Sequence, residues 1–428
     1  MRNRASFIGL VAAAALVAGV VVGLQMPTVE GQGQPTTTAA VPSEKGGQDV
    51  FGGYIAANWP KPLTALPGHG DWTWGAGQSV FAESPNRVFV LQRGELPTIH
   101  KRPATVKVAP SIEFPIGRLP VRDATSASPP GALFKPGTQE PGDDSDTGQR
   151  GVDWRWEHIV TVFNAQGDLV EDWTQWDKMF RRPHAIYISP YDPQKNIWIV
   201  DDYRHAIFKF SNDGKTLLQT LGEVNVPGDD NRHFYRPTFM AWLPSGEFFV
   251  ADGYANTRVV KFDKDGRFLM TWGQKGTPPE KRPGYFNNVH GVAVDPQTRR
   301  VFVNDRQNNR VQVFDENGKY LDEWTFGPRG ISDIHLFIIT SDRALWAFDR
   351  GTSKMLKYSL DGKFQYSWGT WGDFTGAFWG VHGMAVDQEG NVYTAAVDSG
   401  GAQKFSPRPG ANPLFLLGKQ VTPGWGTN

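Results

Sequence analysis

The sequence predicts an all-β protein, a six-bladed β-propeller, and three observations lead to this fold class. Units of about fifty residues recur from about residue 80 onward, and the glycines that end three of them, Gly222, Gly273 and Gly327, lie 51 and 54 residues apart. Each unit contains four short runs of β type. An Asp-Gly or Asn-Gly pair separates the third run from the fourth in four units, and such pairs favour two-residue hairpins. Four-stranded units in tandem cannot bury both faces alone, and radial packing around an axis solves this.

The blades follow one another along the chain. The first begins near Ser79 with VFAESPNRVFVLQRG and resumes after an insertion as HIVTVFNAQGDLVEDW. The next four end at the glycines named above and at Gly369, and the sixth is WGVHGMAVDQEGNVYTAAV, continuing through Lys404-Phe405. Its outer strand comes either from PLFLLG near the C-terminus or from residues 51–66. Either segment would close the ring and remove an open sheet edge.

Residues 1–26 have the pattern of an export signal. Arg2 and Arg4 precede an apolar run from Phe7 to Leu24, which is the order that the export machinery reads. The run is close to the ~20 residues that span a bilayer, so a cleaved signal and a retained membrane anchor both remain open. We expect residues 27–50 to form a disordered linker and residues 51–428 to form the propeller. The expected location is the periplasm or the extracellular space.

A Pro/Gly-rich insertion at 103–155 lies between the second and third strands of the first blade. It has no usable hydrophobic periodicity. A loop of this length is typically a lid or a disordered segment, and the sequence leaves both open.

Composition narrows the function classes. Lys+Arg and Asp+Glu are equal at 44 each, so the net charge gives no electrostatic argument for binding nucleic acid. The chain has no cysteine, which excludes disulfides, thiolate nucleophiles and Cys-ligated metals. We expect a monomer whose partner is a small-molecule or peptide substrate, with a membrane tether only if the N-terminal apolar segment is retained.

Three histidines occupy equivalent places in alternate blades. His184, His290 and His382 open the innermost strands of blades two, four and six, in RPHAI, NVHGV and GVHGM. Alternate blades of a six-fold ring are about 120° apart, so the three side chains can converge on the axis. Three neutral imidazoles with one open position form a catalytic zinc arrangement. A lone histidine there is ordinarily a satisfied polar residue, and we assign His335, which has a similar offset in blade five, a supporting or structural role.

Polar side chains at the ends of the second strands should reach the same rim. Arg93 in VFVLQRG and Arg306 in VFVNDRQ hold matching positions in blades one and four, and Tyr254 in VADGYANTR holds a similar one in blade three. Two guanidinium groups can hold a carboxylate, and a tyrosine near cations and a metal could have a lowered pKa and act as a base. The alternative for Arg306 is an ion pair with Asp305 or Asp349.

The units resemble NHL repeats and, more specifically, the propeller of the peptidyl-α-hydroxyglycine α-amidating lyase family. The resemblance covers about residues 79–405, and its most specific pieces are VADGYANTRVVKF, NNVHGVAVD followed by VNDRQNNRVQVF, and RGELPTI. In that family three histidines bind zinc, a tyrosine is the proposed base and arginines bind the substrate. The matching residues here are His184, His290 and His382, then Tyr254, then Arg93 and Arg306.

The resemblance implies a carbon–nitrogen lyase that converts an N-acyl- or peptidyl-α-hydroxyglycine to a primary amide and glyoxylate. This sequence also departs from the family. Gly383 replaces an Asp that helps to hold a structural calcium, which argues against calcium, although backbone carbonyls near Val80 and Ile186 could contribute. Gly380 stands where the family has a Met, and the family's disulfides are absent. No second domain supplies the copper-dependent hydroxylation that makes the peptide substrate. The natural substrate is therefore open.

Two other functions compete with the lyase. The first is a non-catalytic NHL-type propeller, an exported module that binds a ligand or a protein. The second is a calcium-dependent hydrolase of the gluconolactonase type, which would need carboxylates and an Asn at the axis where this sequence has histidines.

Overall fold

The computed structural model describes residues 50–98, 105–109, 112–115, 151–152, 154–327 and 332–425. The expected export signal or anchor, nearly all of the expected linker and most of the insertion at 103–155 lie outside the described residues. Among the described residues, no helix has the length and apolarity needed to cross a membrane.

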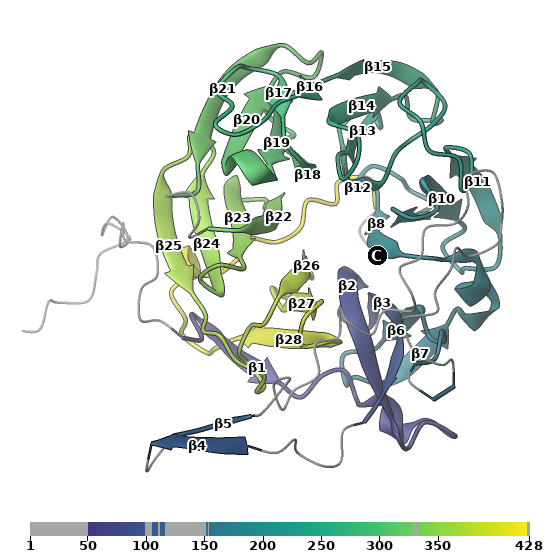
Figure 1. The fold of residues 1–428 in the computed structure, drawn as a ribbon, viewed down its shortest axis with the longest axis vertical. Helices are drawn as coiled ribbons and strands as arrows, with labels where there is room; N and C mark the ends of the chain where they lie inside the picture. Colours follow the sequence, from purple (N-terminus) through teal and green to yellow (C-terminus); the bar gives the residue numbers. More distant parts are fainter. Residues whose placement is uncertain are drawn as a thin grey trace, which may run out of the picture. The chain divides into compact units, whose positions relative to one another are not determined.

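The prediction of an all-β, six-bladed propeller is confirmed. The described part of the chain contains six four-stranded antiparallel sheets arranged in a ring (Figure 1). Their innermost strands contact one another in the order β2, β8, β12, β18, β22 and β26, and β26 returns to β2. These six strands therefore surround a central axis.

Each blade runs from an innermost strand at the axis to an outermost strand at the perimeter of the ring. Blade one consists of β2 (Trp72–Ser84), β3 (Arg87–Pro97), β6 (Val160–Phe163) and β7 (Leu169–Asp172), and blade two of β8 (Pro183–Ile188), β9 (Ile197–Asp201), β10 (Ala206–Phe210) and β11 (Leu217–Leu221). Blade three consists of β12 (Pro237–Trp242), β13 (Phe248–Asp252), β14 (Arg258–Phe262) and β15 (Phe268–Trp272), and blade four of β18 (Val289–Val294), β19 (Val301–Asp305), β20 (Arg310–Phe314) and β21 (Tyr320–Thr325). Blade five consists of β22 (Ile334–Ile339), β23 (Ala344–Asp349), β24 (Lys354–Ser359) and β25 (Phe364–Trp368), and blade six of β26 (Val381–Val386), β27 (Val392–Ala396), β28 (Ala402–Pro407) and β1 (Tyr54–Ala57).

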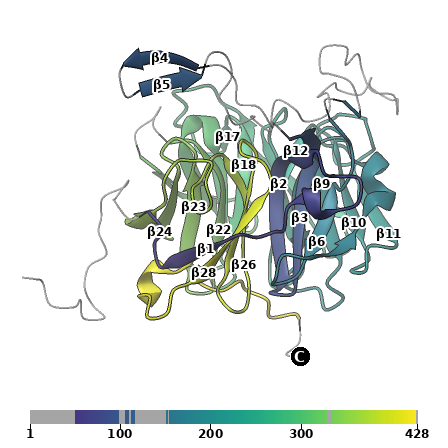
Figure 2. The ribbon, with the colours of Figure 1, turned by 90° about the horizontal axis from the view of Figure 1, so that it is seen from below.

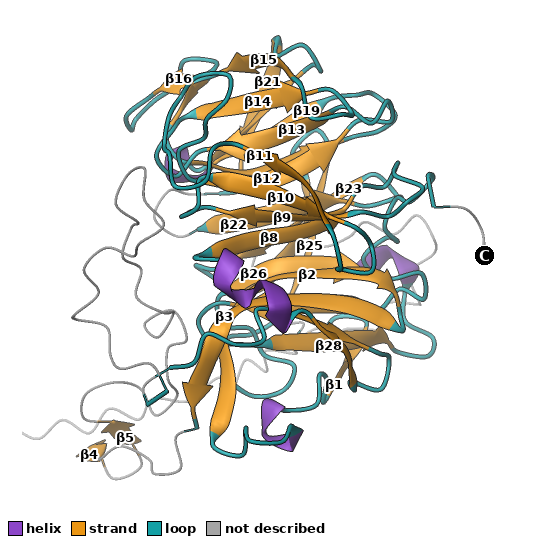
Figure 3. Cartoon of the chain, turned by 90° about the vertical axis from the view of Figure 1, so that its right-hand side faces the viewer, coloured by secondary structure: helices purple, strands orange, loops and turns teal. Residues whose placement is uncertain are grey.

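The remaining elements are short and lie in connections. Two small pairs of strands, β4 (Thr105–Ala109) with β5 (Ile112–Pro115) and β16 (Gln274–Lys275) with β17 (Tyr285–Phe286), stand apart from the blades. The 3-10 helices are η1 (Leu63–Ala65), η3 (Thr174–Met179), η4 (Arg306–Asn308) and η5 (Pro413–Phe415). Figure 3 shows how little of the chain these helices take up beside the strands.

The ring is closed by the N-terminal strand. β1 pairs antiparallel with β28, with Tyr54 opposite Pro407 and Ala57 opposite Lys404, and Figure 2 shows the purple strand beside the yellow one. Of the two segments predicted for this position, residues 51–66 therefore supply the outer strand, and the PLFLLG segment forms η5 instead. Because one strand of this blade comes from the N-terminal end of the propeller sequence and three come from its C-terminal end, the blade's hydrogen bonds join those ends and cover the edge of β28.

The hairpins between the third and fourth strands differ from the prediction in all four blades with an Asp-Gly or Asn-Gly pair. In blade two the Ser211 N–H donates to the Thr216 carbonyl (2.9 Å), which is a four-residue loop. In the loop after β14 the Gly266 N–H donates to the Asp263 carbonyl (3.1 Å) and the Asp263 N–H donates to the Arg267 carbonyl (2.9 Å), which is a three-residue loop. Only the glycine has positive φ, at 82°. The Asp263 carboxylate accepts the N–H groups of Asp265 and Arg267, and this local bonding favours the longer turn over the two-residue one. Gly318 and Gly362 repeat the pattern.

Candidate active site

Three histidines converge where the innermost strands of alternate blades begin. His184, His290 and His382 lie at the start of β8, β18 and β26, and in each strand the register with the second strand shifts at or beside the histidine. Such an irregularity lets one residue turn out of the plane of the sheet. All three side chains are buried, and one ring nitrogen from each lies within 4.8 Å of the others. The structure therefore brings together the three residues predicted as metal ligands.

The backbone fixes how these rings point. The Nδ1–H of His184 donates to the Thr238 carbonyl (3.0 Å), and that of His290 donates to the His335 carbonyl (2.5 Å). The Nδ1–H of His382 donates to the Gln78 carbonyl (2.8 Å). The Nε2 atoms are then the unprotonated nitrogens of the neutral rings. Burial, reinforced by neighbouring histidine and arginine charges, lowers the pKa of each ring well below its usual 6.5. Neutral imidazoles oriented by a second hydrogen bond are the form that binds zinc, so the residues fit the ion.

Tyr254 reaches the same point from the end of blade three's second strand. Its hydroxyl lies 3.2 Å from Nε2 of His184 and 2.9 Å from Nε2 of His290. Burial, together with the nearby Asp202 carboxylate, raises the pKa of Tyr254, and Arg182, Arg306 and Arg93 oppose this rise. The lowered pKa that we expected is therefore not a property of the protein without an ion. The hydroxyl thus lies beside the unprotonated nitrogens of two of the three histidines that would hold an ion.

The two predicted arginines have different environments. Arg93 in β3 is buried, donates from Nε to the Pro183 carbonyl (3.3 Å) and approaches Asp202 (3.8 Å). Burial, aided by the Arg182 charge, lowers the pKa of Arg93, and Asp202 and Asp201 oppose this. Arg306 begins η4.

Arg306 forms an ion pair, but not with Asp305 or Asp349. Its Nε donates to Asp333 (3.0 Å) and its Nη2 lies 2.6 Å from Nε2 of His335. Asp305 pairs instead with Arg310, whose Nε donates to the Asp305 carboxylate (2.8 Å). His335 thus orients Arg306 through its ring and His290 through its carbonyl, which is the supporting role that we assigned to it.

Sequence reasoning missed a buried charge cluster beside Tyr254. Asp202, fully buried, faces Arg236 (Nη2, 2.9 Å), Arg182 (Nε, 3.4 Å) and the more distant Arg93. The Arg236 guanidinium stacks over the Tyr254 ring at 4.7 Å. Three guanidinium groups therefore share the Asp202 carboxylate, so their positive charge exceeds its negative charge. The sequence feature that could have indicated this cluster is the Arg-Pro pair that opens both blade two and blade three, in RPHAI and RPTFM.

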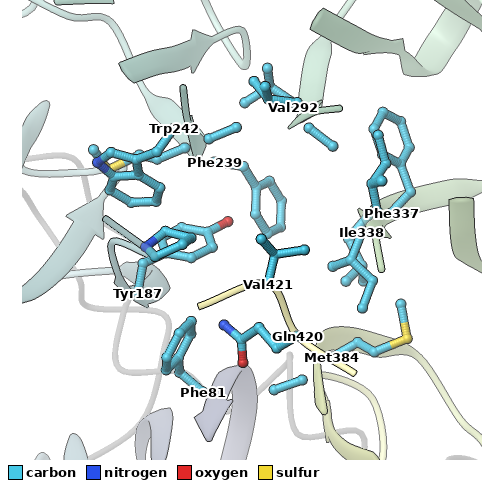
Figure 4. A pocket seen from close by; sticks show the side chains of 18 of the residues that line it. Phe81, Tyr187, Phe239, Trp242, Val292, Phe337, Ile338, Met384, Gln420 and Val421 are labelled. Carbon is cyan, nitrogen blue, oxygen red and sulfur yellow. The ribbon is translucent and has the colours of Figure 1, made fainter. Parts of the chain in front are cut away.

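An apolar cavity of about 160 Å³ lies along the inner strands next to the histidines (Figure 4). Phe239, which lines it, packs edge-on against His184 at 4.9 Å and His290 at 5.1 Å. Val80, one of the two positions near which carbonyls were considered for calcium, lines the cavity, and so does Gly383, where the family has an Asp. Ile186, the other position considered, is not among the lining residues, and among the described residues that line the cavity there is no carboxylate. A Cβ on Gly383 would meet Ser79 Cα at 2.5 Å, so no aspartate fits there. The residues present do not fit a calcium ion.

Comparisons with known proteins bear on the fold and on the resemblance to the amidating lyases. The family described as "6-bladed beta-propeller" matches residues 286–393. The chain is 30% identical over 278 residues to peptidyl-glycine alpha-amidating monooxygenase A of Xenopus laevis, which covers 60% of this chain and 28% of the frog protein. It is also 30% identical over 278 residues to peptidyl-alpha-hydroxyglycine alpha-amidating lyase 1 of Drosophila melanogaster, which covers 60% of this chain and 50% of the fly protein.

A third relative has a different name. NHL repeat-containing protein 3 of Mus musculus is 32% identical over 174 residues, 39% of this chain and 48% of the mouse protein. The chain thus spans half or less of the length of these three relatives. The resemblance to the amidating lyases is confirmed by relatives of that name.

Proposed function

We propose that this protein is a zinc-dependent lyase that cleaves the C–N bond of an N-acyl- or peptidyl-α-hydroxyglycine to a primary amide and glyoxylate. The observation that carries the proposal is the convergence of three buried neutral histidines, two of which, His184 and His290, contact the hydroxyl of Tyr254. The relatives named amidating lyases support a lyase role. The requirement for zinc and the exact reaction rest on the residues of the site.

His184, His290 and His382 would hold the ion through Nε2, because their Nδ1 atoms are bound to backbone carbonyls. A bound zinc ion would supply Lewis-acid polarisation of the substrate's α-hydroxyl. The buried guanidinium groups of Arg93 and its neighbours outnumber Asp202, so they attract the carboxylate at the glycine end of the substrate. Arg306, oriented by Asp333, adds a further guanidinium on the opposite side of the channel.

Tyr254 lies where it can take the proton of the α-hydroxyl. As the C–O bond becomes the aldehyde C=O, the C–N bond breaks and its electron pair passes to the amide nitrogen. That nitrogen receives one proton and leaves as a primary amide, so the reaction consumes no water. The guanidinium groups around the Tyr254 ring favour its ionised form, which is the form that a base must reach.

The proposal also includes the protein's setting. We infer that it is exported, acts outside the cytoplasm as a monomer and takes a small-molecule or peptide substrate. The apolar run from Phe7 to Leu24 supports export, with removal or retention of that segment deciding whether the protein is tethered to a membrane.

The experiment is a glyoxylate assay on α-hydroxyhippurate, run with the purified protein, after chelation and after zinc is restored. The proposal predicts glyoxylate that disappears with the chelator and returns with zinc. No glyoxylate from zinc-loaded protein would contradict the lyase reaction. No glyoxylate and no bound metal would favour the alternative function, a binding propeller, to which the similarity with NHL repeat-containing protein 3 points.

A further inference from the structure

A second cluster of metal-ligating side chains lies away from the three channel histidines. It consists of His69 from the loop that precedes β2, Glu95 from β3 and His158 from the residues just before β6. One ligand atom from each of the three lies within 4.8 Å of the others. These residues are far apart in sequence, and none of them takes part in the proposed reaction.

Glu95 is the centre of the cluster. Its side chain is fully buried, and its two carboxylate oxygens face Nδ1 of His69 (2.9 Å) and Nδ1 of His158. The backbone holds it in place, because the Glu95 N–H donates to the Arg155 carbonyl (2.8 Å) and the Arg155 N–H donates to the Glu95 carbonyl (2.9 Å). Both imidazoles therefore direct Nδ1 at the same carboxylate, whose backbone is held by two hydrogen bonds.

The surroundings of His158 match those of a metal ligand. Its second ring nitrogen, Nε2, lies 3.0 Å from a carboxylate oxygen of Asp172. Metal-binding histidines usually donate their other N–H to a carboxylate, which fixes the ring and raises its basicity. The backbone beside the ring is fixed too, because the N–H groups of His158 and Ile159 donate to Asp177 (3.1 Å each). One histidine thus has both a ligand partner and a supporting carboxylate.

We propose that His69, Glu95 and His158 form a second site for a divalent transition-metal ion such as zinc. Two imidazoles and one carboxylate are a ligand set that zinc and related ions accept. Tetrahedral zinc places its ligand atoms about 3.3 Å apart, so the cluster needs only small side-chain shifts to bind the ion. The ion would take the place of the protons that lie between each imidazole and Glu95 in the metal-free protein. It would join the loop after η1, β3 and the start of β6.

The same contacts would also form in a metal-free cluster in which His158 is an imidazolium ion paired with Glu95 and Asp172. The two interpretations differ in what His69 does. In the ion-pair cluster His69 adds one hydrogen bond at its edge, whereas in the metal site it is one of three ligands. Its side chain lies in a loop outside the blades, and its removal leaves the contacts of His158 with Glu95 and Asp172 in place.

The test counts zinc in the full-length protein. Metal is removed by chelation and desalting, zinc is added back by equilibrium dialysis at pH 7.5, and zinc per chain is measured by plasma mass spectrometry. The variants are H69A, the channel variant H184A/H290A and their combination. The matched control is H233A, because the His233 side chain is 14% exposed and also contacts two carboxylates, but those of Asp230 and Glu223 are exposed whereas that of Glu95 is buried.

We expect two zinc ions per wild-type chain, one in H69A, one in H184A/H290A, none in the combined variant and two in H233A. Zinc should also raise the melting temperature of H184A/H290A but not of the combined variant. If the wild type and H69A bind the same number of ions, the second site is wrong. If zinc binding survives in H184A/H290A and disappears in H69A while the wild type binds only one ion, the second site stands and the channel site fails.

Discussion

The buried carboxylate of Asp202 offers a quantitative test of the charge cluster beside Tyr254. In D202N the three guanidinium groups of Arg93, Arg182 and Arg236 lose the carboxylate that they share. The asparagine side chain keeps the size of the aspartate and one acceptor oxygen but not the charge. The change therefore isolates electrostatics from packing.

The expected loss follows from the distances. Arg236 donates from Nε (3.0 Å) and Nη2 (2.9 Å) to one oxygen of Asp202, and Arg182 Nε lies 3.4 Å from the other. At an effective dielectric of 20, each of these pairs contributes about 5 kcal/mol of Coulomb energy. Desolvation offsets much of it, and removing one partner of a buried pair costs about 3–5 kcal/mol. Because asparagine keeps one hydrogen bond, we expect D202N to lose about 3 kcal/mol of unfolding free energy.

The assay is equilibrium urea unfolding at pH 7 with and without sodium glycolate, a small carboxylate. Glycolate should stabilise D202N more than the wild type, because it can replace the missing charge, whereas sodium chloride at equal ionic strength should not. D265N is the control, since Asp265 forms an exposed pair with Lys264 and its change should leave the urea midpoint unchanged. A loss below about 0.5 kcal/mol in D202N, or equal stabilisation of both proteins by glycolate, would show that Asp202 does not balance the three guanidinium groups.

Three further predictions concern other parts of the molecule. Burial lowers the pKa of His205 from 6.5 to about 4, so its contribution to stability is complete above pH 6.5 and is lost as the pH falls toward 4. Between pH 7 and 4.5 the wild type should therefore lose about 2 kcal/mol more unfolding free energy than H205N, measured in urea, and equal losses would contradict this. Y254F should lower kcat on α-hydroxyhippurate by about 10²-fold to 10⁴-fold while zinc per chain stays unchanged, and Y235F should keep full activity. G383A should lose about 2 kcal/mol in urea, because its Cβ would meet Ser79 Cα at 2.5 Å, whereas G70A, in open space, should lose nothing measurable.

Much of the fold and of the channel site could be predicted from the sequence because both follow the repeat. The four-run units with recurring glycine turns indicated the blades, and equivalent positions in alternate blades indicated that His184, His290 and His382 meet. Tyr254 followed in the same way, because the end of a second strand always reaches the same rim. A repeat thus converts sequence spacing into spatial proximity.

The residues that were missed or misassigned depend on local bonding or on loops. The two-residue hairpins were wrong because the Asp263 carboxylate bonds to two backbone N–H groups of the turn. Arg306 pairs with Asp333 because Asp305, its neighbour in sequence, is already bound to Arg310. His69 reaches Glu95 through a loop outside the repeat, so no spacing rule connects them.

Product analysis of α-hydroxyhippurate tests our proposal that the channel site breaks a C–N bond without hydrolysis. The zinc-loaded protein should give benzamide and glyoxylate in equal amounts, with both lost in the zinc-treated H290A variant. Hydrolysis of the amide would instead give benzoate, with glyoxylate and ammonia arising from the released hydroxyglycine. Equimolar benzamide would therefore support the account, and benzoate, or the absence of both products, would contradict it.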